Sequence, residues 1–216
     1  MHPTQVLKAW RTGLNRRQIA WGAAAALLGA STLGMAQGAA AETLRIVPST
    51  TITVLDPIWT TAYVTRNFGY MVFDTLFGTD AQGKIQPQMV GKWTTSADNK
   101  TWTFTLRDGL AFSDGAAVTS EDVIASLKRW SSRDTLGGLM AQSLDRYEAV
   151  DAKTFQIVLK QPFGLMLEAL GKPSSNVPFI MPRRIAETPG DTQIKEIVGS
   201  GPVSYTHLTL PTILLV

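Results

Sequence analysis

Side-chain types alternate strictly over residues 101–107, and few folds accommodate such a pattern. Threonines, with Arg107 at the end, occupy every second position, and large apolar residues lie between them. The apolar members are Trp102, Phe104 and Leu106. A period of two built from aromatic and β-branched residues is typical of a half-buried β-strand. Because the turn-forming run 97–100 precedes it, we expect this strand to form a hairpin with residues 92–96.

A helix is expected shortly after this strand. Asp108 and Asp114, each followed by glycine, punctuate the connection. Thr119 lies three residues before Asp122, which is the spacing of a capping box at a helix start. Two basic residues suit the negative end of the helix dipole, namely Lys128 and Arg129. The expected buried face consists of Val123, Leu127 and Trp130.

The segment before the hairpin should contain a strand and a helix. Residues 42–50 include Leu44, Ile46 and Val47 and predict a short strand. Asp56 then precedes a proline that interrupts regular secondary structure, because proline disfavours helical conformation at the residue before it. Apolar residues at helical spacing predict an amphipathic helix over residues 60–77. They are Tyr63, Phe68, Met71, Val72, Leu76 and Phe77.

The segment after the helix repeats the hairpin pattern. A second hairpin is expected at 147–162, followed by a short helix that ends at Gly171 as a C-cap. Residues 172–202 form a crossover rich in proline, glycine and serine, with another short helix near 182–188.

Residues 1–41 have the three parts of an export signal. The positive region spans 11–17, the mostly apolar region spans 19–33, and three alanines before Glu42 form a cleavage site. An uncleaved membrane anchor is the alternative, but the apolar stretch is short and interrupted by glycines. The pair Arg16-Arg17 resembles a twin-arginine signal, and export by the Sec route stays open. The chain has no cysteine to form a disulfide or carry a lipid.

The basic character of the chain belongs to this leader. The net charge is +3, yet residues 1–41 hold four basic and no acidic residues. The remainder carries 16 basic against 17 acidic residues. A nucleic-acid partner therefore loses its main support.

Residues 42–202 contain neither histidine nor cysteine. This absence excludes Ser-His-Asp and Cys-His catalysis and the usual zinc sites from that segment. We expect no catalytic residue, metal or cofactor. A secreted hydrolase with carboxylate chemistry, such as a glycosidase, remains the alternative. However, its candidate acids all have structural reasons to occur where they do: Asp108 and Asp114 in turns, Glu121 and Asp122 at a helix start.

One stretch, residues 91–130, resembles the signature of family 5 bacterial solute-binding proteins, the peptide and nickel group that serves ABC importers. The matching positions are Trp93, Ser96, Asp98, Thr101, Phe104, Leu106, Arg107, Gly109, Phe112, Asp114, Gly115, Glu121, Asp122, Val123, Ser126 and Arg129. Residues 55–62, 180–187 and 197–202 also resemble parts of this family, in the expected order.

The resemblance implies an α/β fold of the type II periplasmic-binding-protein class, with two lobes and an extra subdomain. The chain would hold only part of lobe I plus that subdomain. Lobe I would use 42–83 and resume at 172–202, and 84–171 would be the inserted subdomain. The second lobe would lie beyond this chain, together with the acidic residue that pairs with the N-terminus of bound peptides.

The resemblance also implies a ligand surface. Two segments should face the solute: the loop after the first strand, and the crossover. The candidate residues are Thr50, Thr51, Trp59, Thr60, Thr61, Tyr63, Lys172, Ser174, Ser175 and Asn176. Aromatic residues offer flat apolar area, and serine and asparagine offer adaptable hydrogen bonds.

The implied function is capture of a peptide-like or other small solute in the periplasm and its delivery to ABC permease subunits in the inner membrane. The full-length protein is expected to be a soluble monomer without a lipid anchor. A membrane-tethered receptor module is a further alternative.

The last residues, 203–216, differ in character from the rest. Charge disappears, and the string at 203–212 matches one reading frame of a transposon-derived sequencing adapter. We therefore expect the native sequence to depart from this one at or near Val203, and we assign no role to His207.

Overall fold

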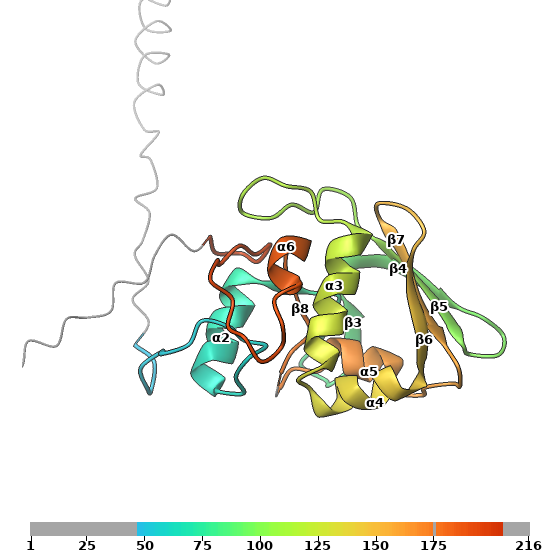
Figure 1. Cartoon of the computed structure of the whole chain (residues 1–216), viewed down its shortest axis with the longest axis horizontal. Coiled ribbons are helices and arrows are strands. Elements are labelled where there is room, and N and C mark those ends of the chain that lie inside the picture. The colour runs from blue at the N-terminus through green and yellow to red at the C-terminus, as the bar shows by residue number, and fades with distance from the viewer. Residues whose placement is uncertain (1–46, 175, 205–216) are drawn as a thin grey trace, which may run out of the picture. The chain divides into compact units, whose positions relative to one another are not determined.

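The computed structural model describes residues 47–174 and 176–204 (Figure 1). The expected signal peptide and nearly all of the segment from 203 onward lie outside these residues. So does most of the strand expected at 42–50; its described part, 47–50, is exposed and lies in no strand. The elements below all belong to one unit that begins at Pro48.

The first helix is shorter than its apolar pattern indicated. Helix α2 spans Tyr63–Val72, so the expectation of a helix over 60–77 was wrong at its C-terminal end. The chain turns extended at Phe73 and forms β1 (Asp74–Thr75) and β2 (Phe77–Thr79). Strand β1 pairs with β8 (Phe179–Ile180), and β2 pairs with β3 (Ile85–Pro87), both antiparallel. Strand pairing, including that of β1 with the distant β8, therefore overrides the local helical spacing.

The two predicted hairpins are confirmed and combine into one sheet. Its order is β4-β5-β7-β6, with all neighbours antiparallel. The strands are β4 (Val90–Thr95), β5 (Thr101–Leu106), β6 (Leu144–Ala149) and β7 (Thr154–Leu159). Asn99 adopts a φ of 56° in the first turn, a conformation that asparagine tolerates well. Phe104 of β5 stacks on Phe155 of β7, with ring centroids 5.2 Å apart.

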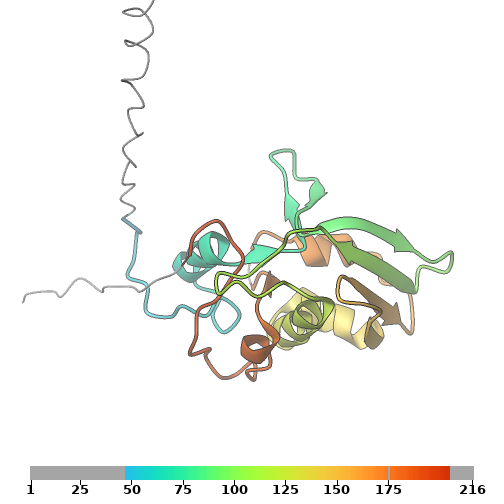
Figure 2. The ribbon, with the colours of Figure 1, turned by 90° about the horizontal axis from the view of Figure 1, so that it is seen from above.

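Helix α3 (Ser120–Ser131) lies between this sheet and the segment that carries β8 and α6 (Figure 1). Its capping box is confirmed: the Thr119 hydroxyl accepts from the Asp122 N–H, and the Asp122 carboxylate accepts from the Thr119 N–H. Val123, Leu127 and Trp130 are fully buried, as predicted. Figure 2 shows α3 and α4 (Thr135–Ser143) along one face of the sheet.

The two basic residues expected at the end of α3, Lys128 and Arg129, lie in its last turn, and Arg129 is in addition buried and paired with Asp56. One expectation about a helix end needs correction. Gly171 was expected as a C-cap, but it is the last residue of α5 (Met166–Gly171) and has no positive φ. A Cβ there would come within 2.9 Å of Ile85, so close packing explains this glycine.

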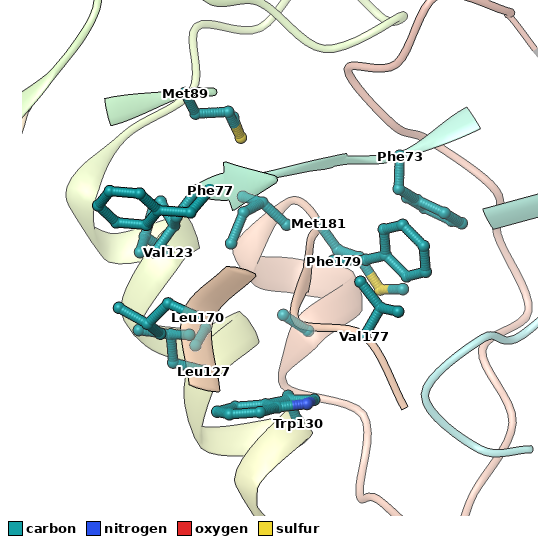
Figure 3. Packing of buried hydrophobic residues seen from close by; sticks show 14 of the residues in the cluster. Phe73, Phe77, Met89, Val123, Leu127, Trp130, Leu170, Val177, Phe179 and Met181 are labelled. Carbon is teal, nitrogen blue, oxygen red and sulfur yellow. The ribbon is translucent and has the colours of Figure 1, made fainter. Parts of the chain in front are cut away.

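One apolar core joins the helices to the short strands (Figure 3). Leu127 and Trp130 of α3 and Leu170 of α5 belong to the same buried cluster as Phe77 and the crossover residue Phe179. A short helix near 182–188 was predicted, and α6 spans Arg183–Ala186. Residues 176–182 of the crossover are therefore buried in the core, whereas most of residues 187–197 are exposed or half-buried.

The return segment at 199–203 closes against the end of α2. The Gly201 N–H donates to the Val72 carbonyl at 2.9 Å, and the Val203 N–H donates to the Met71 carbonyl at 2.9 Å. A Cβ on Gly199 would lie 2.0 Å from the Val72 oxygen. Only glycine fits so close to another backbone.

Candidate functional site

The carboxylate of Asp56 determines the conformation of the loop formed by residues 57–61. Asp56 accepts hydrogen bonds from the backbone N–H groups of Ile58 (3.0 Å) and Trp59 (3.2 Å). A carboxylate that binds amides two and three residues ahead forms a compact turn. The turn sends residues 59–61 toward the surface while Asp56 itself stays buried.

Arg129 completes this arrangement from helix α3. Its two terminal nitrogens donate to the two carboxylate oxygens of Asp56, at 3.1 and 2.7 Å. The same guanidinium donates to the carbonyls of Thr188 (2.8 Å) and Thr192 (2.9 Å). A buried ion pair requires such complete hydrogen bonding, because removing two charges from water is costly.

The ionisation of Asp56 reflects its partners. Burial raises the pKa of this carboxyl group, but the hydrogen bond from Arg129 and the backbone N–H of Ile194 outweigh the burial. The pKa of Asp56 consequently lies below its ordinary value. Asp56 is therefore an anionic anchor at neutral pH.

Asn176 brings the two predicted ligand segments together. Its side-chain nitrogen donates to the carbonyls of Ile58 (2.9 Å), Thr60 (3.1 Å) and Pro57 (3.3 Å). Its own backbone carbonyl accepts from the Trp130 indole at 2.7 Å. Asn176 is 3% exposed, so its amide serves the loop and not the solvent. Asn176 thus joins the loop to the crossover, and the exposed side chains of these two segments make up the candidate surface.

Two aromatic residues stand on this surface. The Trp59 indole donates to the Asp191 carbonyl at 3.1 Å, which fixes the ring against the 188–194 segment. Tyr63 is 70% exposed at the start of α2, and the Arg66 guanidinium lies 4.6 Å from its ring centroid. Such a cation–π contact orients the ring without covering it.

The remaining predicted residues are less tightly joined. Lys172 pairs with Asp134, which also caps helix α4 by accepting from the Gly137 N–H at 2.9 Å. Ser174 is exposed, and Ser175 lies outside the described residues. Thr50, Thr51 and Thr61 are exposed, whereas Thr60 is half-buried. A ligand role for all ten residues stays a prediction.

Two surface hollows lie beside this surface, and none of the ten predicted residues lines either one. The first, about 460 Å³, runs between α3 and α6 and includes Lys128 and Arg183. The second, about 480 Å³, is walled by Tyr70, Asp74 and Pro173 among others. Burial raises the pKa of Asp74, and weaker effects of hydrogen bonds from Thr75 and Gln88 do not offset it.

The acids that a carboxylate-dependent hydrolase would need already have partners. Asp114 pairs with Arg184 at 2.9 Å, and Glu121 pairs with Arg183 at 2.8 Å. Asp122 caps α3 and also accepts from the Arg183 N–H at 2.7 Å. Within 47–174 and 176–204, no group of three His, Cys, Asp or Glu residues could hold a metal ion.

Sequence reasoning missed the two residues that organise the site. Asp56 was interpreted only as the residue before a proline that interrupts regular secondary structure, and Arg129 only as a basic residue at the end of a helix. The available signal was that Arg129 is the last position of the family signature although its helix already has a second basic residue there, Lys128.

In the part of the chain that is described, no helix is long and apolar enough to cross a membrane.

Comparison with known families identifies the family of the chain. The profile described as "Bacterial extracellular solute-binding proteins, family 5 Middle" matches residues 84–208, more than half of the chain. The chain belongs to this family. Its members are transport components and not enzymes. The match reaches past Val203, and the position of the native boundary stays a prediction.

Two curated relatives carry transport names. The chain is 38% identical over 187 residues to "Probable peptide ABC transporter periplasmic-binding protein y4tO" of Sinorhizobium fredii, covering 86% of this chain and 34% of the relative. It is 30% identical over 180 residues to the glutathione-binding protein GsiB of Salmonella typhi, covering 82% and 35%. The chain therefore spans about a third of the length of these relatives.

Solved structures confirm the fold class as type II periplasmic binding protein. The protein AgaA of A. tumefaciens R10, in complex with agropinic acid, aligns with a TM-score of 0.61 and 29% identity, covering 73% of this chain and 32% of AgaA. An oligopeptide transporter substrate-binding domain of Bacillus anthracis aligns with a TM-score of 0.55 at 22% identity, which supports the fold alone.

Proposed function

We propose that this chain supplies one wall of a solute-binding site in the periplasmic component of an ABC importer. The observation that carries the proposal is the surface formed by the 57–61 loop and the crossover, joined through Asn176. This surface combines exposed aromatic area at Tyr63 with threonine and serine hydroxyls. The curated relatives named for peptide and glutathione support a peptide-like solute.

We further propose the division of the chain that the family implies. Residues 42–83 and 172–202 belong to one lobe, and residues 84–171 are an inserted subdomain. The second lobe and the rest of the protein lie beyond the native part of this chain, which is unable to bind solute tightly by itself. The complete protein is exported by the leader, acts as a soluble periplasmic monomer and delivers its solute to permease subunits without catalysing a reaction.

Sequencing the gene past the codon for Pro202, followed by purification of the complete product, makes this proposal testable. Thermal unfolding is measured with a panel of dipeptides, oligopeptides, glutathione, an opine and a nickel chelate. We expect one class to raise the midpoint of unfolding, because a ligand that binds only the folded state stabilises it. A panel that leaves the midpoint unchanged would contradict the proposal.

A tryptophan pair provides the matched control. Trp59→Ala should weaken binding of the active solute at least tenfold, because the ring lies on the proposed surface. Trp93 is also partly exposed, at 37%, but lies on strand β4 away from the loop and the crossover. Trp93→Ala should leave the affinity unchanged within about twofold, and equal losses in both variants would argue against this surface.

A further inference from the structure

A single guanidinium links the three segments that surround the proposed solute surface. Arg129, in the last turn of α3, donates to Asp56 just before the 57–61 loop. It also donates to the carbonyls of Thr188 and Thr192, in the segment after α6. These contacts span more than 55 residues in sequence, so Arg129 connects a helix of the inserted segment with both loops.

The geometry requires arginine at this position. Four donor bonds leave the guanidinium in different directions within one plane, and its side chain is 2% exposed. Lysine has one ammonium nitrogen and cannot reach two carboxylate oxygens and two separate carbonyls at once. The Asp56 carboxylate is equally committed, since it also accepts from Ile58, Trp59 and Ile194.

The second loop bears directly on the proposed surface. In sequence, Asp191 lies between Thr188 and Thr192, whose carbonyls accept hydrogen bonds from Arg129. The Asp191 carbonyl accepts from the Trp59 indole at 3.1 Å. Arg133, one turn further along from Arg129, donates to the Trp59 carbonyl at 3.0 Å. The ring of Trp59 is therefore hydrogen-bonded to the 188–192 segment that Arg129 holds, and its backbone carbonyl is hydrogen-bonded to Arg133, at the end of the helix that carries Arg129.

We infer that Arg129 is a positioning residue: without touching the solute, it sets the conformation of the 57–61 loop and the orientation of Trp59. The inference rests on the proposed function only for the statement that this loop meets the solute. It assigns Arg129, a residue of the inserted segment, a role in the recognition surface of another segment.

Hydrogen exchange of the whole chain, followed by NMR, tests the positioning without any ligand. In Arg129→Lys, the amides of Ile58, Trp59 and Ile194 should exchange at least tenfold faster, because the carboxylate that accepts them loses its anchor. Lys128→Met removes a cation from the adjacent, exposed helix position and should change these rates less than twofold. Should Arg129→Lys fail to fold, Arg129→Gln, which also removes the guanidinium while leaving the Asp56 carboxylate in place, provides the same comparison.

The binding measurement on the complete gene product gives the second readout. Arg129→Lys should lower the affinity for the solute found in the panel at least tenfold. Lys128→Met should leave that affinity unchanged. Unaltered loop amides in Arg129→Lys would overturn the inference, and so would faster loop exchange with unaltered affinity. If the wild-type protein binds nothing in the panel while the loop amides respond as expected, the proposed function fails and the positioning of the loop stands.

Discussion

Two regions of this molecule are held together by different means. The hairpin region, the β4-β5-β7-β6 sheet with α3, depends on apolar faces and on turns between neighbouring residues. The loop region, residues 56–61 with the crossover and 188–194, depends on polar contacts between residues far apart in sequence. Asp56 and Arg129 are 73 residues apart, and Asn176 bonds residues 116 to 119 positions away.

The apolar packing of the hairpin region mainly stabilises the fold, whereas the polar contacts of the loop region mainly hold the proposed recognition surface in place. Apolar packing is non-directional and tolerates small shifts, whereas a network of buried hydrogen bonds fixes atoms in place and is costly to leave incomplete. A surface that must present a tryptophan and several hydroxyls to a small molecule needs the second property. We therefore expect damage to the hairpin region to affect the whole fold, and damage to the loop region to act locally first.

The largest effect should follow from Phe104→Ala in the hairpin region. Phe104 is fully buried and stacked on Phe155, so its loss should lower the free energy of unfolding by about 3–5 kcal/mol. Urea unfolding followed by circular dichroism measures this value. Thr105→Ala, on the other face of the strand, should cost less than about 1 kcal/mol. Similar losses in the two variants would contradict the assignment of the buried face.

A smaller but more local effect should follow from Asn176→Asp in the loop region. The substitution keeps the shape but removes the donor from three carbonyls and places a carboxyl oxygen against them, at a cost of at least about 1–3 kcal/mol. Hydrogen exchange should rise in the 57–61 loop before it rises in β5 and β7. The same chemical change at the exposed Asn67 should stay within about 0.5 kcal/mol. Uniform acceleration across both regions would remove the distinction between them.

The smallest effect should be a pH-dependent gain from Asp74→Asn. The raised pKa of Asp74 means that its charged form is disfavoured in the folded state, so the wild type loses stability as pH rises through that pKa. Asparagine is never charged, and the variant should therefore be more stable than the wild type at pH 7. The gain should vanish below the ordinary aspartate value near 3.8.

Asp80 provides a control of opposite sign for this measurement. Hydrogen bonds from Lys84, Gln86 and Gln82 lower the pKa of this exposed carboxyl group. Asp80→Asn should therefore be less stable than the wild type at pH 7, with the difference lost as pH falls through the lowered pKa. Chemical denaturation between pH 3 and 7 measures both variants, and a gain at pH 7 in Asp80→Asn would contradict the reasoning.

The predictability of the two regions follows from the same difference. The hairpins, the Thr119–Asp122 capping box and the buried face of α3 have local signals, since each depends on residues two to four positions apart. The end of α2 was wrong because β1 pairs with β8 more than 100 residues later. Local spacing cannot reveal such a partner.

The candidate site was predictable only in part. Trp59, Thr60 and Asn176 were named from the family resemblance, and the structure joins their segments. The Asp56–Arg129 pair was missed because each residue has an adequate local explanation, as a turn former and as a helix-end cation. Only their burial in three dimensions shows that they belong together.

On this model of recognition, the solute binds on the surface shared by the 57–61 loop and the crossover. Hydrogen exchange of the complete gene product, measured with and without the solute that stabilises it, locates the binding surface. We predict slower exchange in peptides covering 57–63 and 172–176 on binding. A solute that binds and protects only the walls of the Asp74 hollow, or only the hairpin region, would contradict binding at the loop and the crossover.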